Sequence, residues 1–599
     1  MIYHCEDHTC NYWDEGEKLP ERCPQCGRKL LRANEADMTG DDWTALGNTL
    51  WDAEASDKKR MVDCFRKAAY LGSAWGVCNL GICMEQGNGV EADPVQAFWL
   101  YQQAVEMGSL NAVCCLGVCY QYGIGTAPDA EKAAELYCKA AEYGSPRGQM
   151  LLARAFHDGI GVEADAAEAV HWVRAAAYQR YGEGMYRLGV CYEYGDGVEQ
   201  NWEHAVHWFR EAAESGVSTA MTDLGYCYEK GCGVEQSWEQ AFSWYRRGAE
   251  CGDLRSMHNL GYCYEKGRGV EQSWEQAFSW YRRGAECGDP VSMCNLGLCY
   301  KMGHGVEQNW QEAIKWYEQG AQCGDLQSMN NLAYCYERGE GVEQNEDRAL
   351  YWYRRGAEAG SVHCMFCLGW NYSNGVGVKQ DMTEAIRWYT AAAEGGNAAA
   401  MHSLGWHYDH GEGVEQDMKK AIYWYERAAE QNRPAAMNSL GECYAMGRGV
   451  PRDLETAMEW YRRAAELGEA MADYNMGWHL EQAGKLSEAY AHYRKAADGN
   501  DDSAWWALGR FYENGVVVAQ DGKEARRCYE TGEKLGSVKC KMRLARCKLL
   551  GIGGRREKKA GLDLCRQALE LAKESSEKED YGYEAEMNLL RRTIAENES

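Results

Sequence analysis

The chain repeats itself with a period of 36 residues, and this period limits what it can fold into. A small residue, usually the glycine of a Leu-Gly pair, recurs once per period. These residues are Gly81, Gly117, Ala153, Gly189, Gly225, Gly261, Gly297, Ala333, Gly369, Gly405, Gly441 and Gly477. A fixed period of roughly 20 to 50 residues is typical of a solenoid or a propeller, in which each unit contacts its neighbours. A chain of 599 residues can then form a stack of repeats instead of several globular cores.

A single repeat has the pattern of a helical hairpin. One face of its first helix is marked by apolar or small residues at positions i, i+3, i+4 and i+7. These are Met257, Leu260, Gly261 and Tyr264. Gly267 is expected to end this helix, and Ser273 with Gln276 has the spacing of a capping box that starts a second one. Trp280 and Tyr281 are expected to fill the gaps between neighbouring hairpins.

The motif in residues 260–270, which read LGYCYEKGRGV, continues with Ala277 and the pair Trp280-Tyr281. This pattern resembles the Sel1-like repeats, which are related to tetratricopeptide repeats. The resemblance implies an all-α, right-handed α-solenoid of helix-turn-helix repeats. We expect about 14 repeats over residues 41–572, a linker at 34–40 and a C-terminal capping helix at 573–599.

Residues 1–33 form a separate predicted module with four cysteines. Cys5 and Cys10 make one pair, and Cys23 and Cys26 make the second within a Cys-Pro-x-Cys-Gly knuckle. The knuckle is similar to those of zinc ribbons and rubredoxins. Because the segment is too short to bury a core of its own, a structural Zn²⁺ held by the four thiolates is the favoured interpretation, with iron as the alternative.

Composition narrows the class of partner. The formal net charge of −27 repels phosphate backbones, so we expect no nucleic acid and a protein or peptide partner of basic or mixed charge. The sequence has no long apolar window and no signal peptide at its start, which predicts a cytoplasmic protein with no membrane segment. Most of the 28 cysteines are then expected to be free thiols. Nine of them share one repeat position, where packing is the simplest explanation: Cys83, Cys119, Cys191, Cys227, Cys263, Cys299, Cys335, Cys443 and Cys547.

No catalytic motif is present in the sequence. The Gly-x-Gly loops recur in eleven repeats and lack the strand and the lysine of nucleotide-binding motifs. The histidines His402, His407 and His410 fall at positions that vary between repeats. We therefore expect a protein-binding scaffold and no enzyme. Two alternatives remain open: a hydrolase similar to the cysteine-rich, penicillin-binding Sel1-like proteins, and a zinc-ribbon adaptor for nucleic-acid machinery.

The position after the Leu-Gly glycine is the candidate partner-binding site. It lies roughly 150° from the apolar face of the first helix, at about 100° per residue. In six repeats it carries an aromatic residue: Tyr226, Tyr262, Tyr334, Trp370, Trp406 and Trp478. First helices line the inner groove in the related families, and aromatic residues are favoured anchors at binding surfaces. The alternative is that these side chains pack against the adjacent repeat.

Overall fold

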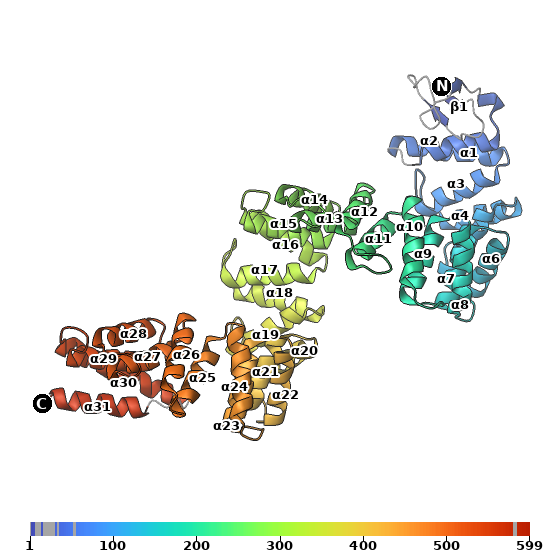
Figure 1. The fold of residues 1–599 in the computed structure, drawn as a ribbon. Coiled ribbons are helices and arrows are strands. Elements are labelled where there is room, and N and C mark those ends of the chain that lie inside the picture. The colour runs from blue at the N-terminus through green and yellow to red at the C-terminus, as the bar shows by residue number, and fades with distance from the viewer. Residues whose placement is uncertain are drawn as a thin grey trace. The chain divides into compact units, whose positions relative to one another are not determined.

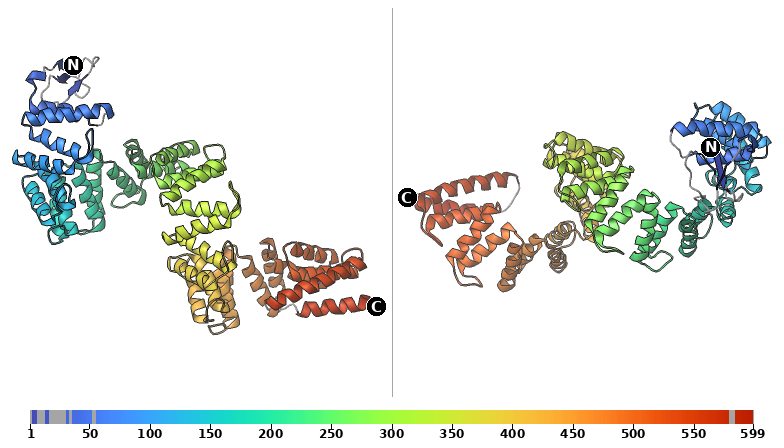
Figure 2. Two further views of the ribbon diagram at one scale, coloured as in Figure 1. Left: turned by 180° about the vertical axis from the view of Figure 1, so that it is seen from behind. Right: turned by 90° about the horizontal axis from the view of Figure 1, so that it is seen from above.

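The computed structural model describes residues 2–5, 13–15, 30–32, 35–51, 55–578 and 584–598. These residues form antiparallel helical hairpins and one small sheet (Figure 1). The chain divides into a first unit, Met1–Gln308, and a second unit, Asn309–Ser599. Within each unit, consecutive helices lie side by side in every view (Figure 2). This arrangement confirms the predicted all-α solenoid.

The described residues of the first unit form three strands, one 3₁₀ helix and the helices α1 to α15. The strands are β1 (Ile2–Cys5), β2 (Trp13–Glu15) and β3 (Leu30–Arg32), and η1 is Glu35–Asp37. The helices are α1 (Gly40–Thr49), α2 (Ala55–Tyr70), α3 (Ala74–Gln86), α4 (Pro94–Glu106), α5 (Leu110–Tyr122), α6 (Ala130–Glu142), α7 (Pro146–Asp158), α8 (Ala166–Tyr178), α9 (Gly182–Tyr194), α10 (Trp202–Glu214), α11 (Ser218–Lys230), α12 (Trp238–Glu250), α13 (Leu254–Lys266), α14 (Trp274–Glu286) and α15 (Pro290–Met302).

The second unit consists of the helices α16 to α31. These are α16 (Trp310–Gln322), α17 (Leu326–Arg338), α18 (Glu346–Glu358), α19 (Val362–Asn374), α20 (Met382–Glu394), α21 (Ala398–His410), α22 (Met418–Glu430), α23 (Pro434–Met446), α24 (Leu454–Glu466), α25 (Ala470–Gln482), α26 (Leu486–Asp498), α27 (Asp502–Asn514), α28 (Gly522–Lys534), α29 (Val538–Leu550), α30 (Lys558–Lys578) and α31 (Glu584–Glu598). Helix α31 packs against α29 and α30.

The ends of the helices follow the local sequence. Helix α13 ends at Gly267, whose φ of 66° is left-handed, and α14 begins after Ser273, whose hydroxyl accepts the backbone N–H of Gln276. The side chain of Gln272 donates to the carbonyl of Glu265 at 2.8 Å, which satisfies one free acceptor in the last turn of α13. The loop glutamine therefore caps the first helix, a role that the repeat pattern alone does not reveal.

Most hairpins close around a buried tyrosine that lies on the Leu-Gly glycine. A Cβ added to Gly261 would lie 2.6 Å from Cε1 of Tyr281, which is 1% exposed. The Tyr281 hydroxyl donates to the Glu265 carboxylate at 2.8 Å. The prediction that Tyr281 fills a gap between hairpins misses this contact within its own hairpin. Because the ring occupies the space of a side chain, this position carries only glycine or, in three repeats, alanine.

The second glycine of each loop joins neighbouring repeats. A Cβ on Gly269 would lie 2.1 Å from the backbone oxygen of Trp238, at the start of the second helix of the preceding repeat. The same close approach occurs between Gly125 and the oxygen of Pro94. This loop is therefore an inter-repeat contact as well as a turn.

The remaining sequence expectations concern cysteines and membrane segments. Of the nine cysteines at the shared repeat position, eight are buried and Cys191 is partly buried. All cysteines among the described side chains are free thiols. Among the helices that the structure describes, none has the length and apolar composition needed to span a lipid bilayer.

The strands near the N-terminus form an antiparallel sheet in the order β2-β1-β3. Tyr3 pairs with Asp14 on one side and with Arg32 on the other, and Cys5 pairs with Leu30. Cys10, Cys23 and Cys26 lie outside the described residues, so the predicted metal site stays a prediction.

Candidate functional site: the exposed aromatic positions of the first helices

The six predicted aromatic residues lie on the first helices of their hairpins. Tyr226 and Tyr262 belong to α11 and α13 of the first unit. The other four belong to the second unit: Tyr334 on α17, Trp370 on α19, Trp406 on α21 and Trp478 on α25. None is buried in the core: Tyr226 is 44% exposed, Trp370 42%, Tyr334 39% and Trp478 37%, while Tyr262 and Trp406 are partly buried.

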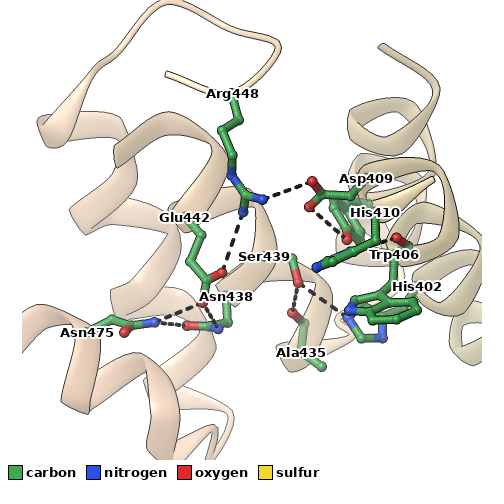
Figure 3. A network of polar contacts seen from close by, with 11 residues as sticks. His402, Trp406, Asp409, His410, Ala435, Asn438, Ser439, Glu442, Arg448 and Asn475 are labelled. Atoms are coloured by element: carbon green, nitrogen blue, oxygen red, sulfur yellow. Dashed lines mark hydrogen bonds and ion pairs between the residues drawn. The ribbon is translucent and has the colours of Figure 1, made fainter. Parts of the chain in front are cut away.

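Polar or charged side chains from the end of the same helix lie against several of these rings. Lys230 lies over the ring of Tyr226 at 5.7 Å from its centroid, and Arg338 lies at the same distance from the ring of Tyr334. The His410 ring stacks on Trp406 with centroids 4.2 Å apart, and its Nδ1 lies 2.9 Å from the Trp406 carbonyl (Figure 3). Each of these rings is thus held by a side chain of its own helix and stays at least partly exposed.

Between Trp406 and Trp478, the same repeat position carries Glu442, which joins a polar network (Figure 3). Asn438 and Asn475 donate to its Oε1 at 3.0 and 3.2 Å. Arg448 lies 3.7 Å from its Oε2 and donates to the buried carboxylate of Asp409 at 2.9 Å. The network links α21, α23 and α25, and it fixes the side chains between the two tryptophans.

Burial changes the proton affinity of two groups here. It raises the pKa of Glu442, and the nearby Arg448 opposes this effect. Burial lowers the pKa of His402 to about 4, with Arg433 adding to the effect, so the ring is neutral at physiological pH. His402 Nε2 lies 3.3 Å from the Ser439 hydroxyl, which itself donates to the Ala435 carbonyl. This histidine therefore has a structural contact and no activated serine beside it.

The first unit has a comparable carboxylate close to its aromatic positions. Asp223 on α11 accepts a hydrogen bond from the Tyr186 hydroxyl at 2.9 Å and forms an ion pair with Arg255 at 3.1 Å. Burial raises its pKa, although Arg255 acts in the opposite direction. Sequence reasoning missed both Asp223 and Glu442. The available signal was a carboxylate at a repeat position where no sister repeat carries an acidic residue.

The predicted metal ligands are not brought together by any described contact. Cys5 ends β1, and the other three cysteines lie outside the described residues. Within the part of the chain that the structure describes, no group of three or more His, Cys, Asp and Glu side chains is placed to hold a metal ion.

Tandem helical hairpins that pack on one another define a class of protein, the helical-repeat solenoids. A family model described as "Sel1 repeat" matches fourteen segments of this chain, and the chain belongs to that family. The matched segments are 76–109, 112–145, 146–181, 182–217, 218–253, 254–289, 290–325, 326–361, 362–397, 398–432, 434–469, 470–501, 504–537 and 538–573. The predicted repeat number is confirmed. No curated protein matches the chain.

Many solved structures are similar to this protein, among them two further Sel1-like repeat proteins. The first is c5321, a protective antigen of uropathogenic Escherichia coli strains displaying an SLR fold. It is 32% identical, the alignment covers 75% of this chain and 97% of that one, and the TM-score is 0.52. The second is a Sel1 repeat protein from Oxalobacter formigenes, 30% identical over 41% of this chain and 96% of that one, with a TM-score of 0.38.

Proposed function

We propose that this protein is a binding scaffold that holds a protein or peptide partner on the first helices of its repeats. The observation that carries the proposal is that one repeat position keeps an aromatic side chain partly or largely exposed in six hairpins. Such side chains bury much area with few rotatable bonds, which suits them to anchor a partner. Membership of a family of protein-binding repeats supports the same role.

The proposal includes a structural Zn²⁺ held by Cys5, Cys10, Cys23 and Cys26. The register of the sheet supports it, since Cys5 pairs with Leu30, and Leu30 follows Cys26 by four residues. At about 3.5 Å per residue, this keeps the Cα of Cys26 within about 14 Å of that of Leu30. Four thiolates match the preference of zinc for soft ligands, and such a closed site has no open position for catalysis.

The proposal assigns no catalytic role and no nucleic-acid partner, and it places the protein in the cytoplasm. The hydrolase alternative relies on paired cysteines in each repeat, whereas Cys287 is an exposed free thiol and Cys294 a buried one. The net charge of −27 argues against a phosphate-rich partner and favours one of basic or mixed charge.

The test replaces two aromatic anchors of the second unit and measures capture of partners from native cytosol. The variant with Trp370→Ala and Trp406→Ala should lose partners that the wild-type chain retains, with little change in melting temperature. The matched control carries Tyr351→Ala and Tyr423→Ala, two residues that are 55% and 48% exposed on the second helices α18 and α22. This control should capture the same partners as the wild type.

Two results would count against the proposal. Equal capture by both variants would show that the tryptophans do not contact the partner. A loss of stability of roughly 3 to 5 kcal/mol in the Trp370→Ala and Trp406→Ala variant, as for buried tryptophans, would show that they serve packing.

A further inference from the structure

A cavity of about 350 Å³ lies in the second unit among α23, α24 and α25. Its lining includes Glu442 and Met446 of α23, Tyr461 of α24, and Asn475, Trp478 and His479 of α25. We call it the Glu442 cavity. One of the six aromatic residues, Trp478, lies in its wall. Glu442, which also lines the cavity, occupies the same position in the preceding repeat.

The cavity coincides with a departure from the repeat pattern. In most hairpins the buried tyrosine of the second helix donates to a side chain 16 residues earlier, at the end of the first helix. Examples are Tyr281 to Glu265 at 2.8 Å and Tyr137 to Gln121 at 2.7 Å. In the repeat of Tyr461 that position is Ala445. The Tyr461 hydroxyl therefore lacks the usual acceptor, and Tyr461 is part of the cavity lining.

The polar groups of the cavity favour a cation. Glu442 Oε1 accepts two amide hydrogen bonds, whereas its Oε2 has Arg448 at the longer distance of 3.7 Å. Arg448 is held instead by Asp409 at 2.9 Å. Arg448 also lines the cavity, but its guanidinium is shared between Asp409 and Glu442, so the charge of Glu442 is only partly compensated. A half-buried carboxylate with an incomplete partner gains from a further charged donor.

The walls favour a flat cation with an apolar stem. Trp478 is 37% exposed and Met446 is 59% exposed, so both offer apolar surface to a ligand. His479 lies edge-on to Trp478 with centroids 4.7 Å apart, and burial lowers its pKa, so the ring is neutral at physiological pH and does not repel a cation. A guanidinium stacks on an indole face and carries five N–H donors, which suit both Glu442 and the Tyr461 oxygen.

We propose that the Glu442 cavity binds an arginine side chain of the partner segment. The guanidinium pairs with Glu442 and donates to Tyr461, and the methylene stem lies between Trp478 and Met446. This inference rests on the proposed scaffold function, for which it supplies one element of sequence specificity.

The test uses the full-length chain, with methionine methyl groups labelled with ¹³C for NMR and the Met446 signal assigned through Met446→Leu. The probe is N-acetyl-L-arginine methylamide, and its neutral isostere is N-acetyl-L-citrulline methylamide. The arginine probe should shift the Met446 methyl signal with a dissociation constant of about 1 mM. The citrulline probe should bind at least about tenfold more weakly, because it cannot form the charged hydrogen bond.

Three variants test the assignment of residues. Glu442→Gln keeps the shape and removes the charge, and should weaken arginine binding about tenfold. Ala445→Gln restores the acceptor that Gln121 supplies in its own repeat, so it should fill the cavity and abolish binding without lowering the melting temperature. Glu426→Gln, an exposed position on α22, should bind the probe like the wild type.

Equal binding of the arginine and citrulline probes, unchanged binding in Glu442→Gln, or no shift of Met446 at about 20 mM arginine probe would each overturn the inference. These outcomes concern the cavity alone. Partner capture that depends on Trp370 and Trp406 would leave the scaffold function in place even if the arginine test failed. A preference for N-acetyl-L-lysine methylamide over the arginine probe would also overturn the assignment.

Discussion

At the scale of single residues, the pairing of a glycine with a tyrosine ring determines how closely the two helices of a hairpin approach. Gly261 faces Tyr281, and Gly405 faces Tyr425, in both cases with a ring atom 2.6 Å from the place of a Cβ. Alanine occurs at this position in three repeats, at Ala153, Ala333 and Ala545. The hairpin of Ala333 also has the buried tyrosine, Tyr353, so one methyl group is tolerated beside that ring. No repeat carries a branched side chain at this position.

Gly261→Val should therefore destabilise the protein by about 3 kcal/mol, because both methyl groups of valine would overlap the buried ring of Tyr281. Gly261→Ala should cost less than about 1 kcal/mol, since alanine also favours the helix. Chemical denaturation followed by circular dichroism measures both values. Ser279→Val, on the exposed face of α14, is the control and should change stability by about 0.5 kcal/mol. Equal costs at positions 261 and 279 would contradict the proposed packing.

At the scale of the hairpin, the two loop glycines have different roles although they look alike in sequence. Gly267 and Gly269 both have positive φ, at 66° and 70°. A Cβ on Gly267 would meet Cβ of Gln272 at 3.3 Å, a tight contact that a small shift relieves, whereas one on Gly269 would overlap the backbone oxygen of Trp238 in the preceding repeat at 2.1 Å. Only the second glycine therefore couples neighbouring hairpins.

Gly269→Ala should destabilise the chain by about 1 to 3 kcal/mol more than Gly267→Ala. Both variants place alanine in the left-handed region, so this strain cancels in the comparison. The difference isolates the overlap with the Trp238 oxygen, which belongs to a helix start and cannot rotate away. Urea denaturation of the two variants gives the difference directly. A zero difference would show that the neighbouring repeat yields at this contact.

The hairpins were predictable from sequence because their signals are local and repeated. Gly267 marks a helix end and Ser273 a helix start, and both roles are confirmed. The angle of Trp370 on its helix predicts that it lies outside the core of its own hairpin, and its side chain is 42% exposed. The Glu442 cavity was not predictable in the same way, since it depends on Ala445, a residue defined by the side chain it lacks. The consequence of Ala445 becomes apparent only in the structure, where the Tyr461 hydroxyl lacks the acceptor that most other repeats supply.

At the scale of the whole molecule, charge and modularity are the two properties that matter. The excess of 91 acidic over 64 basic residues gives a field that attracts basic partners before contact. In a solenoid, stability is approximately a sum over repeats and their interfaces, so a change at one end has little effect on distant repeats.

The association rate of a captured partner should fall about tenfold when the ionic strength rises from about 0.05 to 0.5 M, because salt screens exposed charges. Surface plasmon resonance with the immobilised full-length chain measures this rate. The dissociation rate should change less, since short-range contacts control it. A rate of association that does not depend on salt would contradict electrostatic attraction.

Removal of the predicted zinc ion tests whether the metal belongs to the N-terminal module and whether the repeats stay folded without it. Native mass spectrometry of protein purified without chelators should find one zinc ion per chain, held by four thiolates. Removing it should leave the helical signal in circular dichroism nearly unchanged, because the helices of the described structure lie in residues 40–598, outside the predicted module. The variant with Cys23→Ser and Cys26→Ser should contain no zinc. The control with Cys251→Ser and Cys287→Ser, two exposed thiols of the solenoid, should keep it. Zinc retained by the first variant, or a helical signal that collapses on chelation, would show that the metal belongs to the repeats instead.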